Sequence, residues 1–331
     1  MFNNQTVLIT GGTGSFGRNF ASHLLANYQL KKLIILSRDE WKQFQMQAKL
    51  KDERLRFFLG DIRDLSRLER AFHGVDIIIH AAALKQIPIL EYNPFEGVKT
   101  NILGTQNVIE AAINQGVKKV LLISTDKAAQ PINLYGSTKL CAEKLFINGN
   151  SYSGDKTIFS CVRYGNVLGS RGSIVEMLLR DKNIKEVGLT HECMTRFWIT
   201  LRQSFELVTY ALGNMRGGEI FIPKAPSMKL IDLFDALVPA AAKKIIGIRP
   251  GEKLHEILIT VDEARHALEL EKFYVILPEH YEIFDIKKRY ADFFAAGHQL
   301  SENFSFASDN NKQWLTTAKL KKLLNISDHN S

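Results

Sequence analysis

The fold is decided by residues 6–28, TVLITGGTGSFGRNFASHLLANY. An apolar run, TVLIT, leads directly into the glycine-rich turn GGTGSFG, and an amphipathic stretch follows. Glycines between a strand and a helix let main-chain N–H groups approach a pyrophosphate at the helix N-terminus. Gly11, Gly14 and Gly17 therefore predict a dinucleotide-binding turn. A turn that is tight for packing alone is the alternative.

Four further apolar runs have the composition of buried parallel strands. They are KLIIL at 32–36, RFFLG at 56–60, VDIIIHA at 75–81 and KVLLIS at 119–124. Helical stretches separate the runs, and one of them extends from Asn93-Pro94 to Gly116. This alternation predicts an α/β fold with a Rossmann-type doubly wound parallel sheet, because crossovers between parallel strands are right-handed.

The regular alternation ends after about residue 167. Beyond it, the pattern predicts helices at 174–182 and 202–214, a strand at 219–223 and a further mixed segment, KLHEILI, around 253–259. We expect residues 1–167 to form the dinucleotide-binding domain, with later segments near 197–217 interleaved. Residues 168–331 are expected to form mainly a smaller C-terminal substrate-binding α/β lobe.

The C-terminal tail is too aromatic for a disordered segment. Its aromatic side chains are Phe284, Tyr290, Phe293, Phe294, Phe304, Phe306 and Trp314. We expect the tail to dock and to end in a helix near 316–325.

Composition and charge narrow the class of protein. The 331 residues are 45% hydrophobic and 24% charged, which is typical of a globular protein. The formal net charge is +8, but lysines and arginines are spread along the chain without a nucleic-acid-binding motif. No apolar run approaches the ~20 residues of a membrane helix, and the N-terminus lacks the regions of a signal peptide. We expect a cytoplasmic protein with no nucleic-acid and no membrane partner.

The cysteines indicate neither disulfides nor a metal site. Cys141, Cys161 and Cys193 are odd in number and form no CxxC pair. We assign all three to packing and expect no metal ligand.

The end of the second predicted strand indicates which dinucleotide binds. Folds that prefer NAD place an acid there for the ribose 2′-hydroxyl. Here Ser37 and Arg38 stand at that place. A guanidinium matches a 2′-phosphate in charge and geometry, which favours NADP, although Asp39 follows and an exposed arginine is the alternative. Asp61, after the third strand, is a candidate contact to adenine.

The segment STDKAAQPINLYGSTK, residues 124–139, carries the chemistry. Tyr135 and Lys139 form a YxxxK pair on one helix face, where the ammonium is expected to lower the pKa of the phenol. Thr125 upstream and Asn101 in the preceding helix favour a catalytic pair over an ordinary surface helix.

Motifs along nearly the whole chain resemble one family. They are GGTGSFG, SRDE, GDIRD, AAALK, EYNP, STDKA, NLYGSTK, RYGNVLGSRGS, MTRFWIT, GGEIFIPK and KIIGIRPGEKLHE. Together they resemble the soluble inverting UDP-N-acetylglucosamine 4,6-dehydratases of the pseudaminic acid pathway, in the extended short-chain dehydrogenase/reductase superfamily. The resemblance implies a lyase (hydro-lyase) that uses NADP and UDP-N-acetylglucosamine. It also implies a place in polysaccharide biosynthesis and flagellin glycosylation and a homo-oligomer, either a dimer or a larger assembly such as a hexamer.

The resemblance also implies the reaction steps. Tyr135 would take the 4-hydroxyl proton while C4 gives its hydride to NADP, and the resulting ketone acidifies the C5 proton. Lys127, with its pKa depressed by burial and nearby cations, would remove that proton. Asp126, kept protonated, would protonate the departing 6-hydroxyl, and the hydride would return to C6. Retaining relatives carry Asp-Glu where this chain has Asp-Lys, so inversion at C5 is expected. An ion pair in a loop is the alternative for Asp126 and Lys127.

The family pattern assigns the site residues as follows. The expected catalytic residues are Thr125, Asp126, Lys127, Tyr135 and Lys139. The expected cofactor contacts are Gly11, Thr13, Gly14, Ser15, Phe16, Gly17, Ser37, Arg38, Asp39, Glu40, Lys42, Asp61, Ile62, Ala81, Lys85, Thr100, Asn101, Tyr135, Lys139 and Val167. The expected substrate contacts are Lys85, Asn166, Arg171, Thr190, Arg196, Arg249 and Glu252. Gln86, Glu176 and Cys193 depart from the family pattern near the sugar pocket.

Two other functions are compatible with part of the pattern. A UDP-hexose 4-epimerase also uses YxxxK and a transient 4-ketone, but it needs no acid–base pair for C5 and C6. A non-catalytic NADP-sensing protein would be free to lose Tyr135 and Lys139. The Asp126-Lys127 pair favours dehydration over the first function, and the presence of YxxxK argues against the second.

Overall fold

The computed structural model describes residues 1–154, 156–181, 184–279, 286–324 and 326. Within these residues a ten-stranded sheet has the order β16-β14-β15-β10-β6-β5-β4-β1-β2-β3. Its parallel part consists of β1 (Thr6–Thr10), β2 (Lys32–Ser37), β3 (Leu55–Leu59), β4 (Ile77–His80), β5 (Lys119–Ile123), β6 (Ile158–Val162) and β10 (Ile220–Pro223). The order β3-β2-β1-β4-β5-β6 is that of a Rossmann fold, so the predicted α/β class is confirmed.

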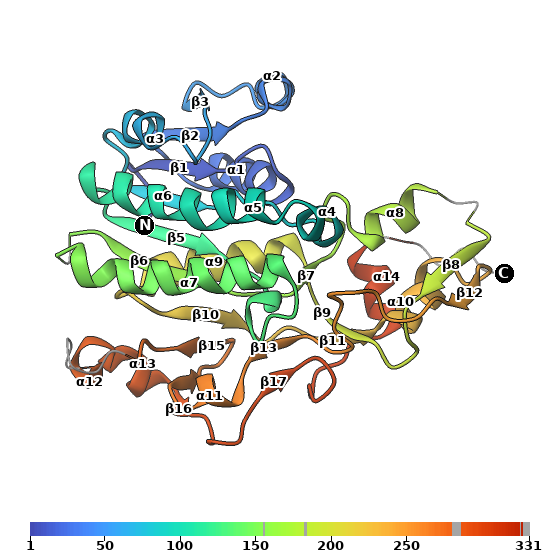
Figure 1. The fold of residues 1–331 in the computed structure, drawn as a ribbon. Helices are drawn as coiled ribbons and strands as arrows, with labels where there is room; N and C mark the ends of the chain where they lie inside the picture. The colour runs from blue at the N-terminus through green and yellow to red at the C-terminus, as the bar shows by residue number, and fades with distance from the viewer. Residues whose placement is uncertain (155, 182–183, 280–285, 325, 327–331) are drawn as a thin grey trace.

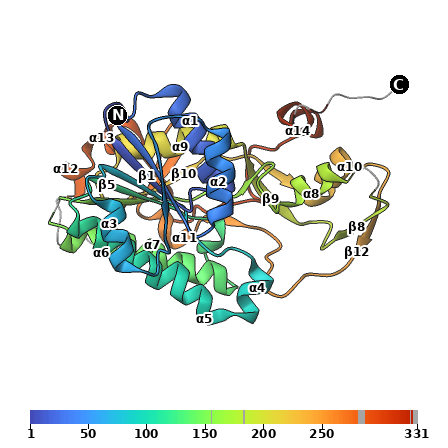
Figure 2. The ribbon, with the colours of Figure 1, turned by 90° about the horizontal axis from the view of Figure 1, so that it is seen from above.

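Helices cover both faces of this sheet (Figures 1 and 2). One face carries α1 (Ser15–Asn27) and α9 (Leu201–Asn214), and the other carries α3 (Leu65–Phe72), α6 (Gly104–Asn114) and α7 (Leu134–Tyr152). The helix α2 (Glu40–Lys49) connects β2 to β3. The central strands are fully buried, with Val7, Ile78 and Leu121 at 0% exposure. Burial on both faces explains why these strands are continuously apolar in the sequence.

One predicted helix is divided in the structure. The stretch after Asn93 forms α5 (Pro94–Gly97), a π-helical turn η1 (Val98–Leu103) and then α6. The apolar spacing predicted a single helix because it does not distinguish a wider turn from a regular one. Such π turns are frequently found at functional sites, and this one carries the site residues Thr100 and Asn101.

The sheet continues beyond β10 with antiparallel strands from the C-terminal half. These are β15 (Phe273–Ile276), β14 (Ala267–Glu269) and β16 (His298–Gln299). The short helices α11 (Val261–Ala264), α12 (Ile286–Arg289) and α13 (Ala291–Ala296) lie beside them. Residues 267–299 therefore extend the large sheet, and the division of the chain into domains at residue 167 stays a proposal.

A second, smaller hydrophobic cluster lies at one end of the molecule (Figures 1 and 2). Its elements are α8 (Ile174–Arg180), β8 (Glu186–Leu189), α10 (Leu230–Leu237), β12 (Ala242–Ile245) and α14 (Thr317–Leu323). Trp198 and Phe234 are at its centre, each 1% exposed. A three-stranded sheet of β7 (Asn166–Val167), β9 (Thr195–Ile199) and β11 (Ser227–Lys229) joins this small lobe to the large sheet.

The structure also tests the expectations for the tail and the cysteines. Phe284 lies outside the described residues, but Tyr290 and Phe306 are buried and α14 occupies the predicted place of the last helix. Cys161 is buried as expected, whereas Cys193 is exposed, so its assignment to packing was wrong. Cys193 lies in the turn before β9, outside the hydrophobic run that the strand buries.

Across the part of the chain that the structure describes, no helix is long and apolar enough to cross a membrane.

Candidate active site

The glycine turn between β1 and α1 is built for a close approach of the main chain. Gly11 has a φ of +63°, and a Cβ atom there would lie 2.8 Å from the Cα atom of Ala82. A Cβ atom at Gly17 would lie 2.6 Å from the Cα atom of Gly12, so α1 packs directly on the turn. The N-cap residue of α1 is Gly14, which offers no side-chain cap. The first N–H groups of this helix are thus left for a ligand such as a pyrophosphate.

The residues at the end of β2 lie as the sequence predicted. The Arg38 side chain is about half exposed, and its Nη1 lies 3.5 Å from Oδ2 of Asp61. Ser37 is buried, and Nε2 of Gln43 donates to its hydroxyl at 3.0 Å. Asp39 caps α2 by accepting from the amide of Lys42 at 2.9 Å. Because the Asp39 side chain caps α2, an acidic residue at this position does not require a contact with the ribose.

A loop after β7 connects the glycine turn to the opposite side of the site. The amide of Arg171 donates to Oγ of Ser15 at 2.8 Å, and Nζ of Lys85 donates to the carbonyl oxygen of Arg171 at 3.5 Å. Gln86 lies against the same loop, since a Cβ atom at Gly172 would lie 3.5 Å from its Nε2. Two predicted cofactor residues and one predicted substrate residue therefore meet at Arg171.

The helix α7 brings the YxxxK pair to the end of β5. Asn133 caps this helix by accepting from the amide of Gly136 at 2.8 Å. Nζ of Lys139 donates to the carbonyl oxygen of Ile123 at 2.8 Å, and burial lowers the pKa of Lys139 to about 8. Burial raises the pKa of Tyr135 to about 12, although Lys127 and a hydrogen bond with Thr125 act in the opposite direction. The predicted lowering of the phenol pKa was therefore wrong, because burial of the phenol outweighs the charge and the hydrogen bond that favour the phenolate.

The predicted Asn101 joins the π turn to this helix. Its Oδ1 accepts from the amide of Leu84 at 2.8 Å, and its Nδ2 donates to the carbonyl oxygen of Leu84 at 2.9 Å and to Oγ1 of Thr138 at 3.0 Å. Asn101 is 1% exposed. Asn101 therefore links Leu84, the residue before Lys85, to Thr138, the residue before Lys139.

The predicted acid–base residues form a close pair in the short 3-10 helix η2 (Asp126–Ala128) after β5. Nζ of Lys127 lies 3.0 Å from Oδ1 of Asp126, and Oγ1 of Thr125 donates to the same oxygen at 3.0 Å. Asp126 is fully buried, and its Oδ2 has no hydrogen-bond partner in the structure as described. Burial raises the pKa of Asp126 against the charge of Lys127, which agrees with its expected role as an acid.

A second carboxylate, Glu256, contacts Lys127 and was missed in the sequence. Its Oε1 lies 3.2 Å from Nζ of Lys127. Burial alone would lower the pKa of Lys127, but the charges of Asp126 and Glu256 outweigh burial and raise it above its ordinary value. The expected depression of the Lys127 pKa was therefore wrong. Glu256 is the last residue of KIIGIRPGEKLHE, one of the motifs that carry the family resemblance, and this motif was the available signal.

Three of the predicted substrate residues meet on the small-lobe side. Nη2 of Arg196 lies 3.3 Å from Oε1 of Glu252, and Oγ1 of Thr190 donates to Oε2 of Glu252 at 3.4 Å. Arg196 is 7% exposed and also donates to the carbonyl oxygens of Thr195 and Leu254. Its guanidinium reaches the acid–base pair through Glu256, whose Oε1 lies 3.8 Å from Nε.

The remaining predicted residues surround these contacts at varied depth. Thr13, Ile62 and Thr100 are buried, Phe16, Ala81, Asn166 and Val167 are half-buried, and Glu40 and Arg249 are exposed. Lys42 forms an ion pair with Asp39. Oγ1 of Thr100 is buried without a hydrogen-bond partner in the described structure. The carbonyl oxygen of Arg249 accepts from the amide of Glu252 at 3.0 Å, so a main-chain turn connects these two predicted substrate residues.

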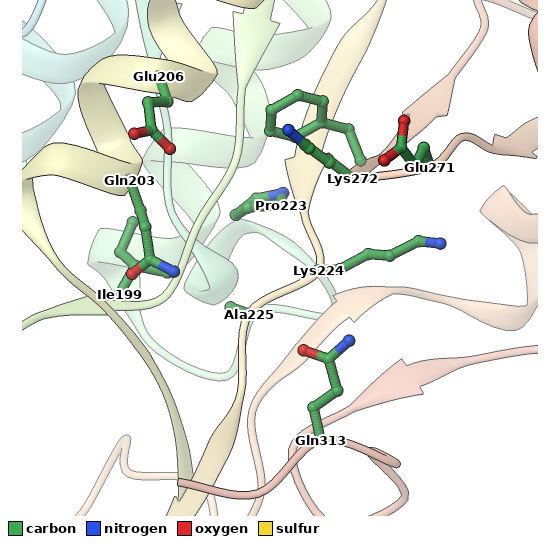
Figure 3. Close-up of a pocket in the computed structure, with 10 residues that line it drawn as sticks. Ile199, Gln203, Glu206, Pro223, Lys224, Ala225, Glu271, Lys272 and Gln313 are labelled. Atoms are coloured by element: carbon green, nitrogen blue, oxygen red, sulfur yellow. The ribbon is translucent and has the colours of Figure 1, made fainter. Parts of the chain in front are cut away.

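A separate cavity of about 270 Å³ contains none of these residues (Figure 3). It is lined by Ile199, Gln203, Glu206, Pro223, Lys224, Ala225, Glu271, Lys272, Phe273 and Gln313. Carboxylates and lysines line it, but none of the predicted catalytic residues does, so the chemistry is assigned to the end of β5.

Comparisons with known proteins show the family to which the chain belongs. The sequence model of the family described as "Polysaccharide biosynthesis protein" matches residues 7–278. The chain is 49% identical to a Campylobacter jejuni (serotype O:23/36, strain 81-176) protein named UDP-N-acetylglucosamine 4,6-dehydratase (inverting), with 99% of each chain covered. It is 38% identical to a Rickettsia rickettsii protein named UDP-glucose 4-epimerase, with 99% of this chain and 98% of the relative covered. Among solved structures, the X-ray structure of Pen from Bacillus thuringiensis has a TM-score of 0.88 at 36% identity, covering 98% of both chains.

Proposed function

Because the chain belongs to the polysaccharide biosynthesis protein family, we propose that it is an inverting UDP-N-acetylglucosamine 4,6-dehydratase. The substrate loses water between C5 and C6, and the product is UDP-2-acetamido-2,6-dideoxy-β-L-arabino-hexos-4-ulose. The single observation that carries this proposal is the buried Asp126 carboxylate 3.0 Å from Lys127, beside the Tyr135 phenol.

A nicotinamide dinucleotide fits the glycine turn, since the uncapped start of α1 and the close approach at Gly11 suit a pyrophosphate. Ser37 and Arg38 support NADP, because Arg38 is exposed and offers its guanidinium beside Asp61. When bound there, a nicotinamide would supply the redox chemistry, as acceptor of the C4 hydride and donor of the same hydride to C6.

The protein's own residues move the protons. Tyr135 takes the proton of the 4-hydroxyl in its phenolate form, which the charge of Lys127 and the hydrogen bond with Thr125 favour against burial. Lys127 in its amine form removes the C5 proton once C4 is a ketone. Asp126 in its acid form protonates the departing 6-hydroxyl, which leaves as water. After the hydride reaches C6, C5 takes a proton that originates from solvent on the face opposite to the one that was deprotonated, so C5 inverts. The diphosphate is held by the cationic side chains of Lys85, Arg171, Arg196 and Arg249.

The epimerase named among the relatives sets the main alternative, since it would share the Tyr135 chemistry. An epimerase needs no acid for C6, whereas here a buried carboxylate of raised pKa stands next to the lysine. This difference favours dehydration. The pseudaminic acid and flagellin pathways, the homo-oligomer and the cellular location stay predictions from the resemblance.

The decisive experiment follows the product by NMR. UDP-N-acetylglucosamine with deuterium at C4 is incubated with the protein and catalytic NADP. We expect a 6-deoxy-4-keto sugar with that deuterium at C6, ring couplings of the L-arabino configuration, and no net consumption of NADPH. In deuterated water, solvent deuterium should enter C5. Formation of UDP-N-acetylgalactosamine instead would assign the protein to the epimerases, and a retained D-xylo ring would refute inversion.

A further inference from the structure

Glu256 contacts the acid–base pair from a distant part of the chain, and the mechanism above gives it no step. It lies just before β13 (Ile257–Ile259), and its side chain is 3% exposed. One carboxylate oxygen lies 3.2 Å from Nζ of Lys127, and the other is buried without a hydrogen-bond partner in the described structure. A buried ionised carboxylate is costly unless it is paired, so its retention here requires an explanation.

The main chain holds Glu256 firmly at this place. Its amide donates to Oγ of Ser308 at 2.9 Å, and the amide of Ser308 donates to its carbonyl oxygen at 2.8 Å. Lys253, three residues earlier, donates to the carbonyl oxygen of Ala129 at 2.6 Å. The segment that carries Glu256 is therefore bonded both to the residues after η2 and to the C-terminal tail.

Cations surround Glu256 and keep it ionised. Nε of Arg196 lies 3.8 Å from Oε1, and Nζ of Lys253 lies 4.0 Å from Oε2. Burial would raise the pKa of Glu256, but Lys127, Arg196 and Lys253 outweigh burial and lower it. The charged and titratable groups that act on Lys127 are Asp126, Glu256, Arg196, Lys253, Lys85 and Tyr135.

The proposed dehydration requires one proton to be shared between Asp126 and Lys127. The ion pair seen here differs from the reactive amine and acid only by transfer of one proton across the 3.0 Å contact. Activity is lost when both groups are protonated and when neither is. Since the two groups interact strongly, the two limits of the pH profile belong to the pair and not to either residue.

We propose that Glu256 is a positioning residue for the dehydration assigned above: its carboxylate holds Lys127 against Asp126 and sets the pH interval in which the pair carries one proton. A permanent negative charge beside the pair favours every protonated form. It therefore moves both limits of the interval to higher pH than the pair would have alone. This inference rests on the proposed function, but the charge effect on Lys127 can be measured separately.

The test compares the Glu256→Gln variant with the wild type over pH. The amide keeps the shape of the side chain and removes its charge. Both limbs of the kcat profile should move to lower pH by about one unit or more, the size of shift that a charge at this distance causes. Glu256→Asp, which keeps the charge, should return the limbs toward their wild-type positions even if kcat stays low.

Glu263→Gln is the matched control, because Glu263 is also a carboxylate in a buried ion pair, with Arg163, 2.7 Å away. Loss of the Glu263 charge should lower the stability of the fold but leave both limbs of the kcat profile at their wild-type pH. A lowered profile with unmoved limbs in Glu256→Gln would show a merely structural role and overturn the proposal.

A second measurement does not depend on the substrate. Trace labelling with acetic anhydride across pH, followed by mass spectrometry, reports the pH at which the Lys127 amine becomes reactive. That pH should fall in Glu256→Gln and remain unchanged in Glu263→Gln. If wild-type protein forms no dehydrated product, the proposed function fails while the labelling result still decides the role of Glu256. An unchanged labelling curve in a folded, NADP-binding Glu256→Gln protein would refute that role.

Discussion

The start of α7 touches the main chain of η2: a Cβ atom on Gly136 would lie 2.2 Å from the carbonyl oxygen of Lys127. No side chain fits in that space, so the helix that carries Tyr135 and the turn that carries the acid–base pair are in direct main-chain contact. The relative position of the phenol and the lysine thus depends on a glycine that performs no chemistry.

Replacing Gly136 by alanine should separate the two elements. We expect Gly136→Ala to lower dehydratase activity by about 10²-fold or more, because a displacement of about 1 Å in a catalytic group has that effect. It should also lower the melting temperature, since overpacking costs roughly 1–3 kcal/mol. Activity and thermal unfolding are measured beside Gly213→Ala, whose Cβ atom would lie 3.8 Å from its nearest neighbour. A fully active Gly136→Ala protein would contradict the close contact.

Removing Lys127 should stop dehydration without stopping oxidation at C4. We expect Lys127→Ala to lose about 10²- to 10⁴-fold in product formation, the usual range for a general base. Substrate should still reduce bound NADP, which is visible as NADPH absorbance, because Tyr135 and Lys139 remain. The exposed Lys144 on α7 provides the control Lys144→Ala, which should leave both readings unchanged. Wild-type rates in Lys127→Ala would end its assignment as the base.

Arg38 should decide the preference for NADP. Changing Arg38 to Asp removes a charge-assisted contact and adds repulsion, so the affinity for NADP should fall by roughly tenfold or more while that for NAD changes less. Both dissociation constants are measured by titration, with Arg202→Asp on the exposed face of α9 as the control. An equal loss for the two cofactors would count against a 2′-phosphate contact.

The buried His80 should make the fold sensitive to acid. His80 lies between two threonines: its Nδ1 is 2.7 Å from Oγ1 of Thr10, and its Nε2 is 3.1 Å from Oγ1 of Thr105. Burial lowers the pKa of His80 from 6.5 to about 3. The unfolded chain binds this proton more readily, so the stabilisation is complete above pH 6.5 and is lost as pH falls toward 3.

The free energy of unfolding should therefore decrease by about 1.4 kcal/mol per pH unit between pH 6 and pH 5 from this residue alone. Urea unfolding at these two pH values measures the decrease. The difference should shrink in His80→Gln and persist in His298→Gln, whose histidine is exposed. Equal acid sensitivity in the wild type and His80→Gln would contradict a neutral buried imidazole.

The parallel sheet and the residues at its ends could be predicted because the signals are local. Five apolar runs lie within about two residues of the observed strands. Asp126, Lys127, Tyr135 and Lys139 lie within one short segment, so spacing alone places them near one another. Arg196 and Glu252 could be assigned to the substrate site only from the resemblance to the family.

The electrostatics could not be predicted because they depend on contacts across the fold. Glu256 follows Lys127 by more than a hundred residues, and only the folded chain brings its carboxylate to 3.2 Å. Burial alone would lower the pKa of Lys127, which is the direction expected from the sequence, and the charges of Asp126 and Glu256 reverse it. The contact of the Lys139 ammonium with the carbonyl oxygen of Ile123 is likewise a contact of the folded chain that no sequence pattern reveals.

The bond between Arg171 and Ser15 bears on how long the cofactor stays bound. The amide of Arg171 faces the dinucleotide turn, while its carbonyl oxygen faces Lys85. Opening the loop for a sugar can break the second contact and leave the first intact, and the loop then stays attached to the dinucleotide turn. In the proposed reaction, a loop that stays attached to the turn would help to retain the reduced cofactor until its hydride returns to the sugar, so that one dinucleotide could serve many substrate molecules in succession.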